Sequence, residues 1–499
     1  MVFRGRPSKA CQRCRTRRLK CDYRRASCTP CLRAAVVCHG YRDSEEIRIE
    51  DQTEATRRKV LLKSKHVSLT ESSLSVSVDI QARMVFFAHY VSVGSRGWDF
   101  LVRWERETEV VPRWLDASID AVSLALLAHQ HVSLPLLSQA RQRYALALGV
   151  MKQALKAPPK AKDSLVAASL LLDLFEKITH TEASVIQFWP SHVNGTLALI
   201  QKIGVEHFQD HYALRIISRF LTNYMISCVA SAHAVSKDVL IVRDHLERHL
   251  NLKDDPKWQM SGLTIQYASL LSAIRTGRWS LQESMARAQE LDQALLAHSQ
   301  NIPPDWQPER RFLQYPLPHV YGQQMDLYRD RHITQTWNVM RQIRIQLNQY
   351  LLDCYDKLNA IHGVNQIAAS EAALSTIAAL SLEIYASVPQ YAGYGCRSER
   401  SQEQADSTDL SIVPQKGCDK VHTPSEVLDC YTLLFPMYIA ARSKAATVEQ
   451  RQWVSYMFRY ISDHFAIRNA LLLAPLLDQN TDINPWCIYA MLGGYGFAA

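Results

Sequence analysis

The 499-residue sequence lacks several features that mark common classes of protein. It contains no charge-free apolar run of transmembrane length, so we expect no membrane-spanning segment. Its opening residues, MVFRGRPSKAC, include no apolar stretch of the kind found in a signal peptide. We therefore expect a chain that works in a reducing compartment, where cysteines remain thiols or bind metal ions.

Common catalytic motifs are also missing from the sequence. There is no Gly-rich phosphate loop, no Gly-x-Ser-x-Gly elbow and no His-Glu-x-x-His pair. His129 and His131 are close in sequence, but residues two positions apart point to different sides of a helix, so we expect no metal pair there. We expect no enzymatic activity, and a helical enzyme with an accessory zinc module is the remote alternative.

Acidic residues are nearly absent from the first 42 positions. This segment has twelve Lys or Arg residues and a single acidic residue, Asp22, which together give a formal charge of +11. The whole chain carries +9, so the remainder is slightly acidic. A concentration of positive charge of this kind is typical of a surface that binds a polyanion such as nucleic acid. A solvated basic tail is the alternative, but it would need no metal framework.

What this segment does contain is a regular set of cysteines. Two copies of the half-pattern Cys-x2-Cys-x6-Cys place them at Cys11, Cys14, Cys21, Cys28, Cys31 and Cys38. A tetrahedral zinc ion takes four ligands, so six thiolates complete two zinc sites only if two sulfurs bridge both ions. The spacing therefore favours one compact two-zinc cluster over separate fingers. A disulfide framework and an iron–sulfur cluster are the alternatives, and both fit the paired spacing less well.

The run CQRCRTRRLKCD, which begins at Cys11, resembles the fungal zinc binuclear cluster (Zn2Cys6) transcription factors. The resemblance covers about residues 8–41. It implies that Cys11 and Cys28 bridge the two zinc ions. Cys14 and Cys21 would complete one zinc site, and Cys31 and Cys38 would complete the other. It also implies a short helix after each Cys-x2-Cys pair, over residues 15–20 and 32–37, with the end of the first helix in the DNA major groove.

The basic residues between the second and third cysteines are the candidate DNA contacts. Arg15 and Lys20 are interpreted as phosphate contacts, which set affinity and register. Arg18 resembles the family's base-reading residue, which is most often Lys, and Arg17 stands beside it. Arg also presents two donors to guanine, so the resemblance implies a CGG-like triplet as target. We expect Leu19, opposite these basic positions, to form the small core.

Two further N-terminal segments bear on DNA binding and assembly. Arg4-Gly5-Arg6-Pro7 looks like the core of an AT-hook, which inserts Arg into the minor groove, and a generic basic arm is the alternative. In either case Arg4 and Arg6 add DNA contacts. Residues 43–80 form a polar linker in which the apolar residues show no heptad repeat. The sequence therefore predicts no coiled coil there, and leaves a monomer or a homodimer through the C-terminal body.

Residues 81–499 show helical patterns nearly throughout. Apolar residues recur with the spacing of one helix face, and alternating strand patterns are scarce. We expect an all-α body with a mobile loop near 391–425 and helices over residues 134–156, 163–179, 206–230, 279–299, 323–356, 366–388, 427–443 and 448–467. The body also resembles the regulatory domain of fungal-specific transcription factors, through QARMVFFAHYV and HVNGTLALIQKIG.

Together these features predict a zinc-dependent, sequence-specific DNA-binding regulator of transcription. The resemblance implies a nuclear protein that acts on RNA polymerase II genes, with double-stranded DNA, co-regulators and a possible small-molecule effector as partners. The alternative is a regulator with only generic DNA affinity that acts through partners recruited by the helical body. Strong salt dependence without sequence preference would identify this alternative.

Overall fold

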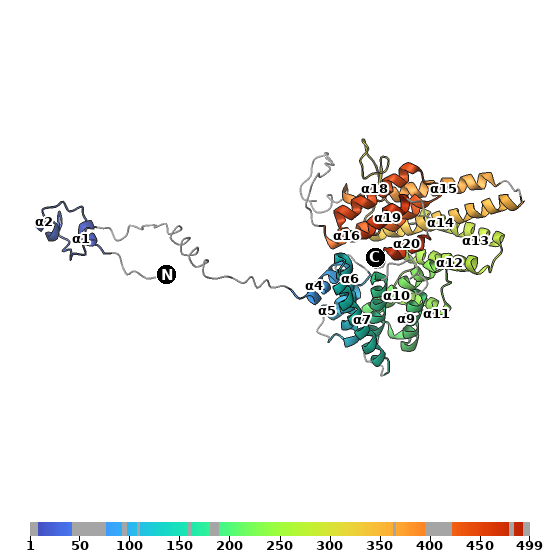
Figure 1. Ribbon diagram of the computed structural model, residues 1–499, viewed down its shortest axis with the longest axis horizontal. Helices are drawn as coiled ribbons and strands as arrows, with labels where there is room; N and C mark the ends of the chain where they lie inside the picture. Colours follow the sequence, from blue (N-terminus) through green and yellow to red (C-terminus); the bar gives the residue numbers. More distant parts are fainter. Residues whose placement is uncertain are drawn as a thin grey trace. The chain divides into compact units, whose positions relative to one another are not determined.

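The computed structural model describes residues 8–41, 76–91, 97–106, 110–156, 162–179, 189–362, 366–394, 422–478 and 484–492. The chain divides into two compact units, residues 1–75 and residues 76–499, and each is described by itself (Figure 1). Arg4, Arg6 and nearly all of the predicted linker lie outside the described residues. So does most of the loop predicted near 391–425, because the description stops at 394 and resumes at 422.

The first unit contains the two short helices that the cysteine pattern implies, but their bounds differ from the expectation. Helix α1 spans Gln12–Thr16 and helix α2 spans Thr29–Arg33. Each helix includes the second cysteine of its pair instead of following it, and ends at least four residues earlier than expected. The reason is a left-handed backbone position after each helix, at Arg18 and Ala35, which prevents the helix from continuing.

The second unit confirms the predicted all-helical body. Its α-helices are α4 (Val78–Phe86), α5 (Val102–Arg106), α6 (Arg113–His131), α7 (Leu134–Ala154), α8 (Asp163–Thr179), α9 (Trp189–Ile203), α10 (His211–Ala230), α11 (Lys237–His249), α12 (Pro256–Thr276), α13 (Leu281–Gln300), α14 (Arg331–His362), α15 (Ile367–Ala386), α16 (Pro424–Tyr431), α17 (Leu434–Arg442), α18 (Val448–Phe465), α19 (Arg468–Asp478) and α20 (Pro485–Met491). Short 3-10 or π turns are η1 (Phe87–Val91), η2 (Asp99–Leu101), η4 (Val205–His207), η5 (Pro304–Trp306) and η6 (Gln390–Tyr394).

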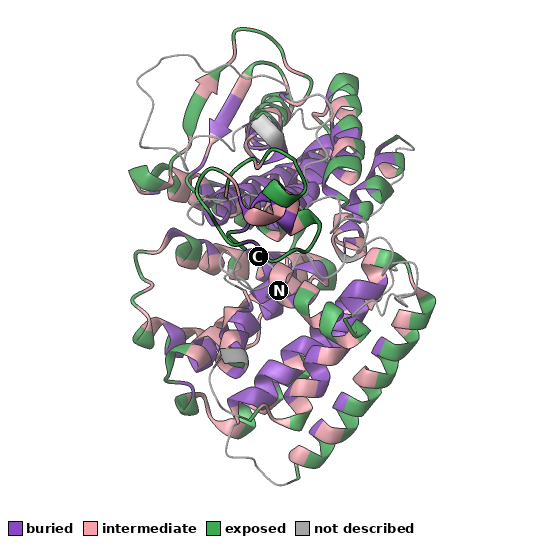
Figure 2. Cartoon of the chain, turned by 90° about the vertical axis from the view of Figure 1, so that its left-hand side faces the viewer, coloured by how far each residue is buried: buried purple, intermediate pink, exposed green. Residues whose placement is uncertain are grey.

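Helix α6, which periodicity did not predict, organises the first helices of the body. Its side chains are buried nearly all round, from Leu115 through Ala128, so no contrast between two faces reveals it in the sequence. Helices α7 and α8 both pack mainly against α6. Figure 2 shows the resulting buried interior of the body, with exposed residues on its outer helices.

One β-hairpin interrupts the helices where a single helix was expected over residues 323–356. Strands β1 (Glu309–Phe312) and β2 (Gln324–Leu327) pair antiparallel, and α14 begins only at Arg331. Arg310 donates two hydrogen bonds to the fully buried carboxylate of Asp326 across the pair, at 3.0 and 3.2 Å. This ion pair fixes the strand register, and Asp330 then caps α14 by accepting a 2.9 Å bond from the Ile333 amide.

Candidate zinc and DNA-binding module

The two half-patterns of cysteines fold in the same way. Cys11 and Cys28 each have an extended backbone, with ψ of 157° and 150°, and each immediately precedes a five-residue helix. A helix of five residues is far too short to be stable alone. Each helix therefore depends on contacts that hold its ends, and each directly follows a cysteine.

The two half-patterns also share the same backbone conformation after their helices end. Arg18 has φ of 51° and Ala35 has φ of 48°, so both lie in the left-handed region. The residue that follows each one donates its amide back to the second cysteine of the pair: Leu19 to the Cys14 carbonyl at 2.8 Å, and Val36 to the Cys31 carbonyl at 3.2 Å. This is the geometry of a Schellman-type helix end, repeated seventeen residues later.

The six sulfurs converge between the two halves. They form two groups of four, in which all sulfurs lie within 4.8 Å of one another: Cys11, Cys14, Cys21 and Cys28, and Cys11, Cys28, Cys31 and Cys38. The two groups share Cys11 and Cys28, whose sulfurs are 3.6 Å apart. Four thiolates at about 2.3 Å from a tetrahedral zinc ion lie about 3.8 Å apart, so these spacings fit the metal. Cysteines arranged in this way are suited to bind zinc.

Most of the thiols of the module are buried. Five of the six cysteines are buried and Cys38 is half-buried. Burial raises the pKa of the Cys28 thiol far above its ordinary value, because a thiolate loses its hydration there. A bound cation would offset this cost, because metal coordination favours the thiolate over the thiol. Within the described residues, no other group of three or more potential metal ligands was found.

Two polar contacts join the halves independently of the sulfurs. Arg13 donates from Nη1 to the Pro30 carbonyl at 3.0 Å, which ties α1 to α2. Asp22 accepts a 3.0 Å bond from the Thr29 amide and a second bond from the Thr29 hydroxyl, at the first turn of α2. The Thr29 hydrogen bonds lower the pKa of the Asp22 carboxyl. Sequence reasoning missed these structural roles, which depend on residues 7 and 17 positions apart.

The candidate DNA contacts mostly lie beyond the helix that was expected to carry them. Arg15 is in α1 and half-buried, with a buried Nη1 that has no hydrogen-bond partner among the described residues. Arg17, Arg18 and Lys20 follow the helix and are exposed. The prediction of a core role for Leu19 is wrong, since its side chain is 44% exposed. The interior is formed mainly by the cysteines, with Ala10 buried among them and Tyr41 packed against them.

The second half lacks the basic residues of the first. Positions seventeen residues after Arg15, Arg17, Arg18 and Lys20 carry Leu32, Ala34, Ala35 and Val37. Leu32 and Val37 are 58% and 76% exposed. The two halves therefore share a backbone but differ in surface chemistry, and the concentrated positive charge belongs to the first.

The loop between the halves contains a left-handed residue. Ala26 has φ of 77°. The proline ring fixes φ near about −65°, so proline cannot adopt this conformation.

Residues 9–46 match the family described as the fungal Zn(2)-Cys(6) binuclear cluster domain. This N-terminal match supports DNA binding, zinc binding and regulation of transcription. It does not extend to the helical body. No curated protein and no solved structure matches the chain.

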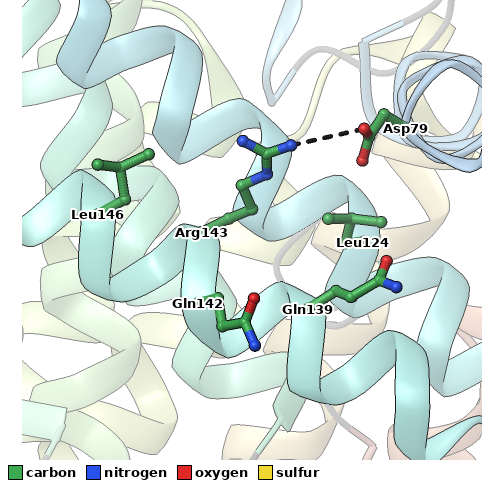
Figure 3. Close-up of a pocket in the computed structure, with 6 residues that line it drawn as sticks. All are labelled: Asp79, Leu124, Gln139, Gln142, Arg143 and Leu146. Carbon is green, nitrogen blue, oxygen red and sulfur yellow. Dashed lines mark hydrogen bonds and ion pairs between the residues drawn. The ribbon is translucent and has the colours of Figure 1, made fainter.

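The described part of the helical body contains a hollow of about 480 Å³ where α4 and α7 pack on α6 (Figure 3). Arg143 Nη2 lies 3.5 Å from Asp79 Oδ2 at this hollow. The sequence identified no pocket residues, and the lining comes from three helices: Asp79, Leu124, Gln139, Gln142, Arg143 and Leu146. Elsewhere in the body, His129 bonds through Nε2 to Asn469 Oδ1 at 2.9 Å.

Proposed function

We propose that this chain is a nuclear, zinc-dependent, sequence-specific DNA-binding regulator of RNA polymerase II genes that acts without catalysis. The observation that carries the proposal is the pair of overlapping sulfur groups that share Cys11 and Cys28. In this account two zinc ions occupy the cluster, bridged by the two shared cysteines. Cys14 and Cys21 complete one site, and Cys31 and Cys38 complete the other.

Zinc has a structural role in this proposal. Each zinc ion would neutralise thiolates that burial otherwise disfavours, and would fix the residue that directly precedes a helix too short to form alone. The chain's own residues then hold the geometry: Arg13 bonds Pro30, and Asp22 bonds Thr29. The metal sets the shape of the module, and the exposed side chains determine what it binds.

The first half of the module faces DNA in this proposal. Its exposed basic residues have only apolar counterparts in the second half, so the electrostatic attraction to phosphate acts on one side. Arg15 and Lys20 contact phosphates, and Arg18, with Arg17 beside it, reads bases of a CGG-like triplet in the major groove. Arg4 and Arg6 add contacts from the N-terminal arm.

The helical body is proposed to regulate the DNA-bound protein through co-regulators and a small-molecule effector. The hollow at Asp79 and Arg143 offers a carboxylate, a guanidinium and two side-chain amides to such a ligand. The competing account gives the module only generic DNA affinity and assigns all specificity to partners of the body.

Binding of labelled duplexes to the full-length, zinc-loaded protein tests the proposal. One duplex carries a CGG triplet, and a second has the same base composition with the triplet scrambled. We expect at least about tenfold tighter binding to the first, loss of binding with a zinc chelator, and recovery when zinc is restored. Equal affinities with a steep salt dependence would establish the generic account. Binding that survives chelation would rule out the zinc cluster as the DNA-binding element.

A further inference from the structure

Arg13 differs from the other basic residues of the cysteine module in where its side chain is directed. Its Nη1 donates a 3.0 Å hydrogen bond to the Pro30 carbonyl, at a partly buried position. No other Lys or Arg side chain among residues 8–41 makes a hydrogen bond within the part of the chain that the structure describes. One positive charge in the most basic part of the chain is therefore directed into the module itself.

Arg13 and Pro30 occupy matching positions in the two half-patterns. Each stands two residues after the first cysteine of its half, Cys11 or Cys28, and these two sulfurs are 3.6 Å apart. Exchange of the halves also exchanges the two groups of four sulfurs, which is a two-fold relation. In a two-fold arrangement, a residue that contacts its own equivalent lies close to the axis. The contact between Arg13 and Pro30 therefore lies where the angle between α1 and α2 is set.

The two helices end differently at these matching positions. The Arg13 carbonyl accepts a 2.9 Å bond from the Arg17 amide, whereas the equivalent amide, that of Ala34, bonds to the Cys31 carbonyl at 3.2 Å. The Pro30 carbonyl accepts the Arg13 guanidinium instead. Carbonyl groups in the last turn of a helix are commonly satisfied by side chains in this way. The Arg13 side chain thus completes the end of α2.

The backbone of Arg13 also supports the segment that carries the candidate base-reading residue. The Arg17 amide, which bonds to the Arg13 carbonyl, directly precedes Arg18 in the chain. On the other side of Arg18, the Leu19 amide bonds to the Cys14 carbonyl at 2.8 Å. Arg18 is therefore held from both sides by carbonyl groups of α1. A rotation of α1 against α2 would carry the Arg18 side chain with it.

We propose that Arg13 is a positioning residue for base reading: its bond to Pro30 fixes α1 against α2 and thereby aims the Arg18 side chain, while Arg13 contacts no phosphate. A functional side chain must be held within about 0.5 Å of its productive position. The cysteines hold each five-residue helix near its first turn, and the Arg13 contact adds a second fixed point that sets the rotation of α1. This inference rests on the proposed function of the module as a reader of DNA.

Salt dependence separates a positioning role from a phosphate contact, which is the alternative role for a basic residue in this segment. Each phosphate contact releases a counterion and adds about 0.9 to the steepness with which log affinity falls with log salt concentration. A positioning residue leaves this slope unchanged. Its loss instead reduces the ratio of affinities for the preferred and the scrambled triplet, because only base contacts carry sequence preference.

Fluorescence anisotropy of the full-length, zinc-loaded protein with the CGG and scrambled duplexes, at several KCl concentrations, tests the positioning role. Arg13→Ala should lower the ratio of the two affinities at least about threefold, which is part of the value of one base contact, and leave the salt slope unchanged. Lys20→Ala should reduce the steepness of the slope by about one and keep the ratio. Arg33→Ala, which removes an exposed arginine from α2, is the matched control and should behave as wild type.

Arg13→Lys keeps one donor for the Pro30 carbonyl and should retain most of the wild-type ratio. Both Arg13 variants should keep about two zinc ions per chain, and zinc loss from Arg13→Ala would overturn the positioning role by making the contact a requirement for folding. A reduced salt slope with an unchanged ratio would make Arg13 a phosphate contact. A wild type without preference for the CGG duplex would reject the proposed function as well. A wild type that prefers it, beside an Arg13→Ala variant with the same ratio, would reject this inference alone.

Discussion

Arg18 and Ala35 occupy matching positions in the two halves of the cysteine module, with the same left-handed backbone conformation. Their φ angles are 51° and 48°, and the next amide in each half bonds back to a cysteine carbonyl. Ala35 shows that this fold accommodates alanine at such a position. The backbone conformation therefore does not require arginine, and the contribution of Arg18 lies in its side chain.

Arg18→Ala should leave zinc content unchanged and relax the base preference. Loss of one two-donor base contact costs about 1–3 kcal/mol of discrimination between the preferred and a substituted triplet. Affinities for duplexes with single base changes in the triplet measure this effect. Arg33→Ala, which removes an exposed arginine from the second half, is the control and should keep the preference. An equal loss for every duplex would make Arg18 a phosphate contact.

Cys28→Ser should remove more zinc than Cys38→Ser. The Cys28 sulfur belongs to both groups of four, whereas the Cys38 sulfur belongs to one and leaves the other group complete. Zinc per chain, measured by mass spectrometry of elements, should fall from about two to near zero for Cys28→Ser and retain about one for Cys38→Ser. Cys487→Ser, in the helical body, should retain the full content. Equal zinc loss from Cys28→Ser and Cys38→Ser would contradict a Cys28 sulfur shared by both sites.

A half-buried ion pair in the body predicts a pH-dependent contribution to stability. His192 Nε2 lies 2.5 Å from Glu176 Oε2, and this hydrogen bond raises the pKa of His192 above its ordinary 6.5. A raised pKa means that the stabilisation is fully present below pH 6.5 and disappears as pH rises through the folded-state value. His192→Gln should therefore destabilise the protein at pH 6, on the order of 1 kcal/mol, and less at pH 8.5.

Urea denaturation at the two pH values measures this difference. His131→Gln is the control, since His131 is exposed at the end of α6 and should respond equally at both. An identical destabilisation by His192→Gln at pH 6 and pH 8.5 would mean that the protonated His192–Glu176 pair contributes nothing to folding.

The cluster was predictable from sequence to the extent that its determinants are local. Six cysteines at repeated spacing predict convergent thiols, and twelve basic residues predict the charge of their surroundings. The helix bounds were not predictable in the same way, because nothing in the residue types Arg18 and Ala35 indicates a left-handed conformation. The exposure of Leu19 was missed for a related reason, since sulfur replaces apolar side chains in the interior.

The all-helical class of the body was predictable from sequence, but helix α6 and the β-hairpin were not. Helices with one apolar face, such as α7, are visible as periodicity, whereas α6 is apolar all round and shows no such pattern. The β-hairpin depends on the ion pair between Arg310 and Asp326, sixteen residues apart, which local patterns do not reveal.

Selection of binding sites from random DNA by the full-length, zinc-loaded protein tests the central claim most directly. The account predicts enrichment of a CGG-like triplet, single or paired, because exposed basic side chains are fixed in place by the first half of the cluster. Enrichment should disappear when the zinc is removed. A zinc-loaded protein that binds DNA but enriches no sequence would contradict base reading by the Arg18 side chain and leave only generic affinity.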